Sequence, residues 1–299
     1  DELILLNEAV TMENFGSDAY TPNEIAQRIE KISISKSTLD PYRVFALSLL
    51  AGAFIAFAAV FYTLVIHDSN LSSGMTRLLG GLVFCLGLIL VIVAGAELFT
   101  GNNLLVMACV DKKITIKQLL INWIIVFFGN FLGSLGIVFL IYLSDQWLIS
   151  DGALGAKAVM IANSKVNLAF IPAFARGILC NSLVCMAVWM CFACHSVTDK
   201  ILTILFPITG FVAMGFEHSV ANMYFIPAGI LAQMNPEIMQ VVGSSVDLSH
   251  LNICGFIDSM LPVTLGNIAG GMQDRYLSIG FSCSEYFHIK SIYHQFVSE

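Results

Sequence analysis

The sequence predicts an all-α membrane protein, a bundle of six membrane-spanning helices built as an inverted three-plus-three repeat with two broken helices. Three observations predict this fold class. Of the 299 residues, 57% are hydrophobic and only 12% are charged, which is about half the charged share of a soluble domain. Six apolar segments are long enough to cross a bilayer core as helices. Two of them are interrupted at matching places by polar residues and glycine.

The composition excludes several function classes. So few charges cannot cover the surface of a soluble enzyme or sustain a disordered chain, and we expect no nucleic-acid partner. The net charge of -7 argues against a polybasic protein that binds a lipid surface. Cys191 and Cys194 form a C-x-x-C pair without a second pair nearby, so we expect no metal site and no cofactor. The first residues are acidic, which predicts no cleavable signal peptide.

Residues 1–42 are predicted to form a cytoplasmic N-terminal segment that contains one helix. Thr21 can cap the helix, Pro22 suits its first position, and Glu24 completes a capping box. Three isoleucines then fall on one face: Ile25, Ile29 and Ile32. We favour a helix that lies on the surface of the bundle, and the alternative is a mobile gate.

Residues 43–273 are predicted to form the six-span membrane domain, and residues 274–299 a C-terminal tail. The fourth apolar segment contains Arg176 near its start, and the sixth continues past Asp258. The fifth meets Glu217 and His218 after 16 residues and then resumes. The six spans are expected at residues 44–66, 78–96, 118–143, 169–194, 201–234 and 251–272.

Lysine and arginine predict the orientation. If the spans alternate in direction, one side holds Arg28, Lys31, Lys36, Arg43, Lys112, Lys113, Lys117, Lys200, Arg275 and Lys290. The other side holds Arg77, Lys157, Lys165 and Arg176. Ten cations against four predict that both termini are cytoplasmic, because cytoplasmic loops of membrane proteins carry the excess of lysine and arginine.

The two interruptions share a pattern. Each has the form Gly-x-Glu followed by an asparagine, and each is followed one span later by Gly-Asn-x-x-Gly. The matching residues are Gly95, Glu97, Asn102 and Asn130 in the first half and Gly215, Glu217, Asn222 and Asn267 in the second. Three spans in each half give the halves opposite orientations. Paired broken helices at corresponding positions are typical of a pore or transport site.

Broken backbone at membrane depth must face protein or a polar cavity, and helix starts there favour an anion. We expect Glu97 and Glu217 to hold the loops by accepting backbone N–H bonds. We expect His218 to line a pore, with the hydroxyl of Thr100 at the equivalent break. An imidazole there can pass a proton to a weak-acid anion, which then crosses an apolar constriction as the neutral acid. Bulky residues nearby are either such constrictions or ordinary packing: Phe84, Leu88 and Phe211.

At these residues the sequence resembles the formate/nitrite transporter family, and in particular its formate channel branch. Five segments carry the resemblance: Gly-Ala-Glu-Leu-Phe-Thr (95–100), Trp-x-x-x-Phe-Phe-Gly-Asn (123–130), Arg-Gly-Ile-Leu-Cys-Asn-x-Leu-Val-Cys (176–185), Gly-Phe-Glu-His-Ser-Val-Ala-Asn-Met (215–223) and Pro-Val-Thr-Leu-Gly-Asn (262–267). Together they cover roughly residues 20–272.

The resemblance implies an aquaporin-like protomer in a homopentamer of a bacterial inner membrane, with one pore per protomer. It implies passage of formate and of related small anions or their acids, among them nitrite, hydrosulfide, acetate and lactate. It also implies roles for single residues. Thr100 is the loop tip, His218 the central pore histidine and Asn181 a residue that bonds near it. Glu97, Glu217, Asn102, Asn222, Asn130 and Asn267 support the broken helices. Leu88 forms the inner constriction and Phe211 the outer one, Phe84 is a further constriction residue, and Lys165 belongs to the external vestibule. The N-terminal helix becomes a candidate pH-sensitive gate.

Three alternatives and one departure from the family pattern are considered. A nitrite or hydrosulfide channel of the same family is the first alternative, since apolar constrictions select for size and charge more than for identity. A water or glycerol channel would need Asn-Pro-Ala at both breaks, and this tripeptide does not occur. An enzyme is not expected, because its ionisable residues should cluster as a nucleophile and a base. The tail after Gly271 is polar and departs from the family pattern.

Overall fold

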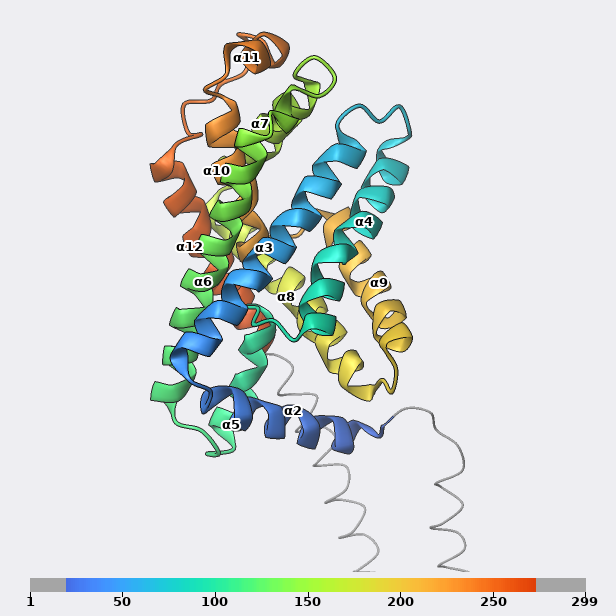
Figure 1. Cartoon of the computed structure of the whole chain (residues 1–299), viewed down its shortest axis with the longest axis vertical. Coiled ribbons are helices and arrows are strands. Elements are labelled where there is room, and N and C mark those ends of the chain that lie inside the picture. The colour runs from blue at the N-terminus through green and yellow to red at the C-terminus, as the bar shows by residue number, and fades with distance from the viewer. Residues whose placement is uncertain (1–19, 273–299) are drawn as a thin grey trace, which may run out of the picture.

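The structure, a computed structural model, describes residues 20–272, and every regular element in this part of the chain is a helix (Figure 1). The predicted tail and the first 19 residues lie outside the described residues. The elements in order are α2 (Pro22–Ser37), α3 (Pro41–Ile66), α4 (Ser73–Ala94), η1 (Gly101–Leu104), α5 (Leu105–Val110), α6 (Ile116–Leu143), η2 (Gln146–Leu148), α7 (Ala153–Val166), α8 (Phe170–Ala193), α9 (Val197–Met214), α10 (Ser219–Ala232), α11 (Pro236–Val242) and α12 (Ile253–Met272).

Six of the described helices are long and apolar enough to cross a membrane, which confirms the predicted number of spans: α3, α4, α6, α8, α9 and α12. The boundaries differ by a few residues where polar caps extend a helix beyond its apolar run. α9 begins at Val197 rather than at residue 201, because Ser196 and Asp199 form a capping box before the apolar residues. Shorter apolar helices follow both interruptions, at Gly101–Val110 and Ser219–Ala232.

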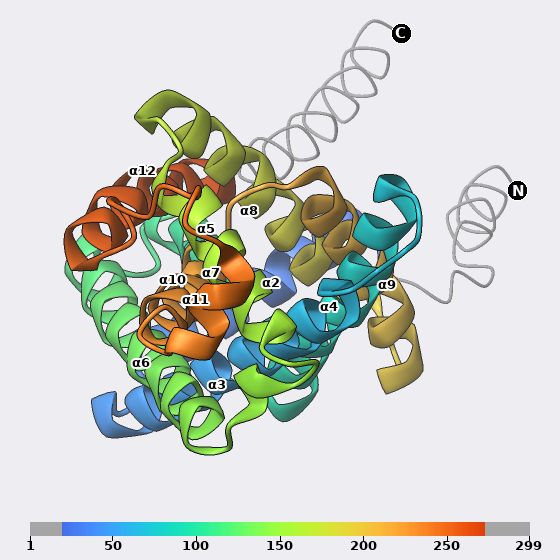
Figure 2. The same cartoon turned by 90° about the horizontal axis from the view of Figure 1, so that it is seen from above.

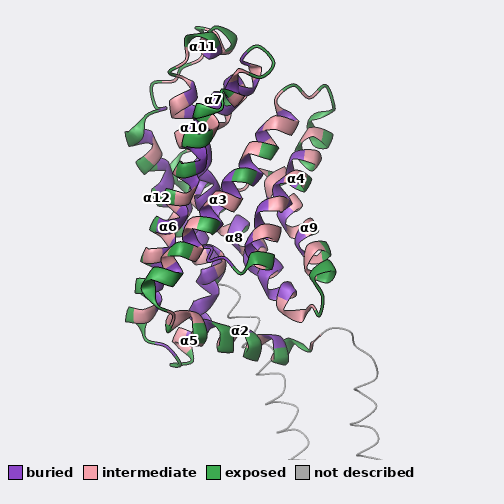
Figure 3. Ribbon diagram, viewed as in Figure 1, coloured by how far each residue is buried: buried purple, intermediate pink, exposed green. Residues whose placement is uncertain are grey.

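The N-terminal helix α2 lies across one end of the bundle (Figure 1). Its capping box of Thr21 and Glu24 is present as predicted. Ile25 and Ile29 are buried against residues of α5 and α8, but Ile32 is 38% exposed. Figure 3 shows that buried residues lie along the inner sides of the helices and exposed ones on the outer sides.

Within each half, the first and third spans pack closely at small residues. In the first half, a Cβ at Gly133 of α6 would overlap the carbonyl oxygen of Leu49 in α3. In the second half, a Cβ at Gly266 of α12 would overlap the carbonyl oxygen of Phe174 in α8. Close backbone approach at small residues is how helices associate in a bilayer, where burial of apolar surface gives no advantage.

The two halves meet through α4 and α9, which run antiparallel. The thiol of Cys85 lies 3.5 Å from the carbonyl oxygen of Leu205 and 3.4 Å from the hydroxyl of Thr209, and Gly81, one turn earlier, also contacts Thr209. Both helices end in the same way, at glycines with left-handed backbone: Gly95 with φ +70° and Gly215 with φ +73°. A residue with a Cβ is strained in that conformation, so glycine is favoured at both breaks.

Helix α7 is absent from the sequence-based expectation. It packs against α10 so closely that a Cβ at Gly229 would overlap Ala162, and with α11 it covers the end of the bundle opposite α2 (Figure 2). Its 14 residues are too few to span a bilayer, so it does not form one of the long apolar segments that mark a span.

The close contact of α3 and α6 can be tested with two glycines of one helix. Gly133→Ala should lower the melting temperature of the detergent-solubilised protein by about 5 °C or more, since the added methyl group meets backbone atoms. Gly136→Ala is the control, because nothing lies within 4 Å of a Cβ at that position. Equal melting temperatures for the two variants would contradict this packing.

Candidate functional site

The first break is held by one asparagine of α6. Asn130 accepts a hydrogen bond from the backbone N–H of Phe99 at 2.9 Å. Its amide donates to the carbonyl oxygens of Glu97 at 2.9 Å and Ser48 at 2.8 Å. Two of these bonds satisfy groups of the break that have no helical partner, as buried backbone requires, and the bond to Ser48 ties the break to α3.

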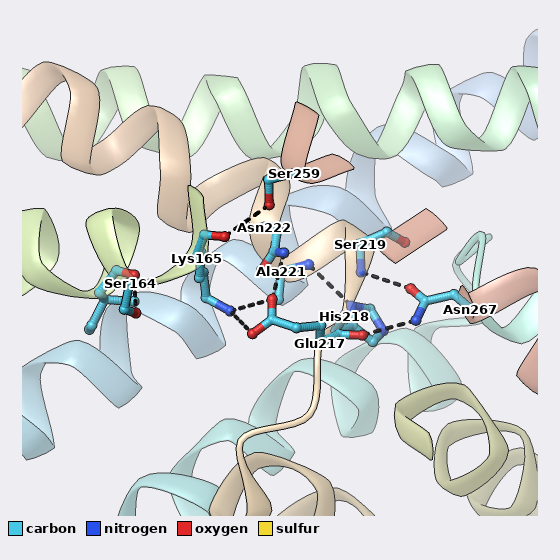
Figure 4. Close-up of polar contacts among 10 residues, drawn as sticks. Ser164, Lys165, Glu217, His218, Ser219, Ala221, Asn222, Ser259 and Asn267 are labelled. Carbon is cyan, nitrogen blue, oxygen red and sulfur yellow. Dashed lines mark hydrogen bonds and ion pairs between the residues drawn. The ribbon is translucent and has the colours of Figure 1, made fainter. Parts of the chain in front are cut away.

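The second break repeats this arrangement with Asn267 of α12 (Figure 4). Asn267 accepts from the backbone N–H of Ser219 at 2.8 Å, and its amide donates to the carbonyl oxygens of Glu217 at 2.9 Å and Gly177 at 2.8 Å. The predicted supporting asparagines thus lie at equivalent places in the two halves.

The two buried glutamates are each held by an asparagine and a lysine. Glu97 accepts from the amide of Asn102 at 2.6 Å and from the ammonium of Lys36 at 3.1 Å. The prediction that these two glutamates accept hydrogen bonds from backbone N–H groups is wrong. The hydrogen bonds that their carboxylates accept come from side chains. The geometry of the breaks explains this: each glutamate lies in a break, and its asparagine lies five residues further on, where the amide reaches the carboxylate.

In the second half the same roles fall to Asn222 and Lys165. Glu217 accepts from Asn222 at 2.8 Å and from Lys165 at 2.9 and 3.1 Å (Figure 4). Sequence reasoning missed Lys36 as a site residue. The sequence offered no signal for it, because its equivalence to Lys165, 129 residues further along, appears only in the structure, where Ser48 and Gly177, also 129 residues apart, accept corresponding bonds.

The two breaks meet at Thr100 and His218. The Thr100 hydroxyl lies 3.0 Å from Nε2 of His218, and both residues are buried. Nδ1 of His218 accepts from the backbone N–H of Ala221 at 3.1 Å and caps α10. An accepting nitrogen carries no proton, so the single proton of the ring lies on Nε2 and is donated to Thr100. Phe211 stacks on the ring at a centroid distance of 5.9 Å.

Asn181 of α8 contacts the threonine and not the histidine. Its amide donates to the carbonyl oxygens of Thr100 at 3.3 Å and Asn267 at 2.7 Å. Asn181 therefore ties the loop of the first break to the helix that supports the second break.

A cavity of about 350 Å³ opens on the α7 side of His218. Phe84 and Phe211 line it and touch edge to face at a centroid distance of 6.0 Å. Lys165 and Glu217 also line it. Sequence reasoning missed four further lining residues, which come from four different helices and have no motif in common: Tyr62, Arg77, Arg176 and Phe225.

A smaller cavity of about 80 Å³ lies on the other side, between α2 and the first break. Leu88 and Lys36 line it, together with Leu98, which sequence reasoning also missed. Leu98 follows Gly95 at the same distance as His218 follows Gly215, so the internal repeat could have found it. His218 itself lines the α7-side cavity, whereas neither Thr100 nor His218 lines the smaller cavity, whose walls include Leu88 and Leu98.

Two helix breaks that meet at mid-bundle, between cavities that open toward opposite ends, define a membrane channel or transporter. In residues 20–272, no group of three His, Cys, Asp or Glu side chains is placed to hold a metal ion.

Comparison with known proteins agrees with this class. The sequence pattern of the formate/nitrite transporter family matches residues 23–273. The "Formate channel FocA" of Escherichia coli (strain K12) is 42% identical over 259 residues, which are 85% of this chain and 91% of that protein. The FocA of Haemophilus influenzae is 41% identical over 280 residues, 89% of this chain and 97% of that protein.

Two solved structures are also similar. One is described as a "Pentameric formate channel with formate bound", at 37% identity and a TM-score of 0.70, covering 84% of this chain and 98% of that one. The other, an "FNT family ion channel", has 26% identity and a TM-score of 0.72 and covers 86% of this chain and 98% of that one. The chain belongs to the formate/nitrite transporter family. It is a multi-pass membrane protein of a transport family and not an enzyme.

The buried ion pair of the second break can be tested by a double-mutant cycle. Lys165→Met and Glu217→Gln should each lower the free energy of unfolding by about 3–5 kcal/mol, since each leaves a buried partner unpaired, and the double variant should lose less than the two singles combined. The measurement is thermal unfolding in detergent.

Glu30→Gln is the control for this cycle. It breaks the pair of Lys113 and Glu30, whose side chains are 54% and 27% exposed, and should cost less than about 1 kcal/mol. If Glu217→Gln lowers the free energy of unfolding no more than this control does, the buried pair stabilises the protein no more than an exposed one.

Proposed function

We propose that this protein moves formate and related small monovalent anions, or their acids, across a bacterial inner membrane. The observation that carries the proposal is the contact between Thr100 and His218, buried between two cavities at the meeting point of the helix breaks. The similarity to a pentameric formate channel with formate bound supports formate as substrate and a homopentamer with one pore per protomer.

The proposed organisation follows the sequence-based prediction. Residues 1–42 form the cytoplasmic segment, residues 43–273 the channel domain and residues 274–299 the tail, and the two halves of the channel domain form an inverted repeat. The antiparallel packing of α4 and α9 and the paired bonds of Asn130 and Asn267 support this repeat. With both termini cytoplasmic, the α2-side cavity faces inward and the α7-side cavity faces outward.

In the proposed passage, His218 exchanges one hydrogen-bond partner for another. Its Nε2–H group, which is donated to Thr100, turns to an oxygen of the entering carboxylate. Phe84 and Phe211 form the outer constriction and Leu88 the inner one. These apolar side chains exclude hydrated ions, because they offer nothing in place of lost hydration.

Proton coupling requires a second proton on the His218 ring. That proton goes to Nδ1, and it displaces the backbone N–H of Ala221 that Nδ1 accepts. The imidazolium then passes its Nε2 proton to the carboxylate, which crosses as the neutral acid and leaves a neutral ring protonated at Nδ1. Acid pH thus favours transport of formate together with a proton, and it breaks the hydrogen bond by which His218 caps α10.

Helix α2 is the proposed gate. Lys36 near its C-terminus bonds to both Glu97 and Asn102, so a displacement of α2 moves the loop that carries Thr100.

Nitrite and hydrosulfide are the alternative substrates, since the constrictions select mainly for size and charge. Measuring how each of them competes with formate flux decides between them.

The proposal predicts formate flux into proteoliposomes and proton uptake with it at acid pH. His218→Asn should reduce the proton uptake by about 100-fold, because a positioned acid contributes at least that much, and the remaining formate flux should no longer depend on pH. The two readouts are a formate assay and a dye that reports internal pH.

His250→Asn is the matched control, because His250 lies in the exposed loop before α12, outside both cavities. The proposed function is refuted if the wild-type protein transports no formate, no nitrite and no other small weak acid. Unchanged proton uptake by His218→Asn refutes the role of the histidine alone.

A further inference from the structure

The α7-side cavity carries more positive charge than its ion pair explains. Three cationic side chains line it, Arg77, Lys165 and Arg176, against the single carboxylate of Glu217. Lys165 is bound to both carboxylate oxygens of Glu217, so its charge is matched (Figure 4). Two positive charges remain in excess, and both belong to arginines.

Neither arginine has a partner that neutralises it among the described residues. Arg77 donates only a long hydrogen bond, 3.4 Å, to the carbonyl oxygen of Ala213. The guanidinium of Arg176 makes no hydrogen bond or ion pair within residues 20–272. Both residues are exposed, and both border the cavity whose floor is His218.

The fold does not require arginine at position 176. The backbone N–H of Glu217 bonds to the carbonyl oxygen of Arg176 at 3.3 Å, and in the first half the N–H of Glu97 bonds in the same way to the carbonyl oxygen of Leu47 at 3.2 Å. The scaffold uses only the backbone at this place, and a leucine serves equally well.

Position 77 differs between the halves in the same way. Val197 follows Arg77 by 120 residues, which is also the separation of Gly95 from Gly215, so the second half has valine where the first has arginine. Both arginines therefore break the internal repeat, and both do so on the side of the α7-side cavity.

We propose that Arg77 and Arg176 form the capture site for small carboxylates at the mouth of the α7-side cavity, and that Lys165 instead serves to hold Glu217. A guanidinium presents parallel N–H groups that match the two oxygens of a carboxylate. Unpaired charge at the mouth of a cavity with apolar walls also raises the local concentration of anions. This inference rests on the proposed function, because it names the residues that receive the same substrate.

The test compares formate entry from the two membrane faces, in right-side-out and inside-out membrane vesicles. Arg176→Leu copies the first half and should raise the half-saturating formate concentration about threefold from the α7 side at low ionic strength. The double variant with Arg77→Val should raise it about tenfold, with a maximal rate that changes less than twofold. Both shifts should vanish at about 0.5 M salt, which screens exposed charges.

Two further variants distinguish the effect of the arginines in the cavity from that of general surface charge. Arg176→Lys keeps the charge and should remain within about twofold of the wild-type value. Lys157→Leu removes a cation of α7 that does not line the cavity, and it should leave the half-saturating concentration unchanged.

The inference is wrong if wild-type vesicles transport formate but Arg176→Leu changes nothing, if it shifts entry equally from both faces, or if Lys157→Leu has the same effect. Arg176→Lys behaving like Arg176→Leu also contradicts it. Vesicles in which the wild-type protein moves no small anion refute the proposed function, which is a separate outcome.

Discussion

The structure depends on the need to satisfy backbone hydrogen bonds at the two places where helices break inside the bundle. Lipid offers no donors or acceptors there, so each exposed N–H or C=O costs several kcal/mol. Asn130 and Asn267 meet this need, each with one acceptor and two donor bonds to the loop and to a neighbouring span. A single amide thus fixes the loop, the span that carries the amide and the span it contacts. The position of Thr100 and His218 follows from these bonds.

The same scaffold carries different side chains in its two halves, and the differences lie where chemistry is expected. His218 stands where the first half has Leu98, and Thr100 stands where the second half has Val220. Residues that keep the repeat, such as Glu97 and Glu217, bond within the protein. Among the residues that break it, Arg77 and Arg176 line the α7-side cavity, and Thr100 and His218 meet at the centre. The halves fold with Leu47 and Val197 at the places of Arg176 and Arg77, which indicates that these two arginines are not needed for folding.

The number of spans and both breaks could be predicted from the sequence, because long apolar runs and glycine before polar residues are local signals. The same signals placed Thr100 and His218 at equivalent breaks, but their contact appears only in the structure. Helix α7 could not, since it is short and only moderately apolar, and its place depends on packing against α10. The partners of Glu97 could not be predicted either. Lys36 lies 61 residues away along the chain, and only the folded structure brings its ammonium to the carboxylate.

One imidazole joins the fold to the chemistry. Nδ1 of His218 caps α10, and Nε2 holds Thr100 of the opposite half. A helix start carries partial positive charge, so a ring that gains a proton there loses its backbone bond and meets an unfavourable dipole as well. The neutral ring is therefore part of the folded arrangement, and the protonated ring opposes it. Any step that charges the ring must also loosen the first turn of α10. In the proposed proton transfer, substrate that takes the Nε2 proton leaves a neutral ring, and the cap re-forms once the remaining ring proton has moved from Nδ1 to Nε2.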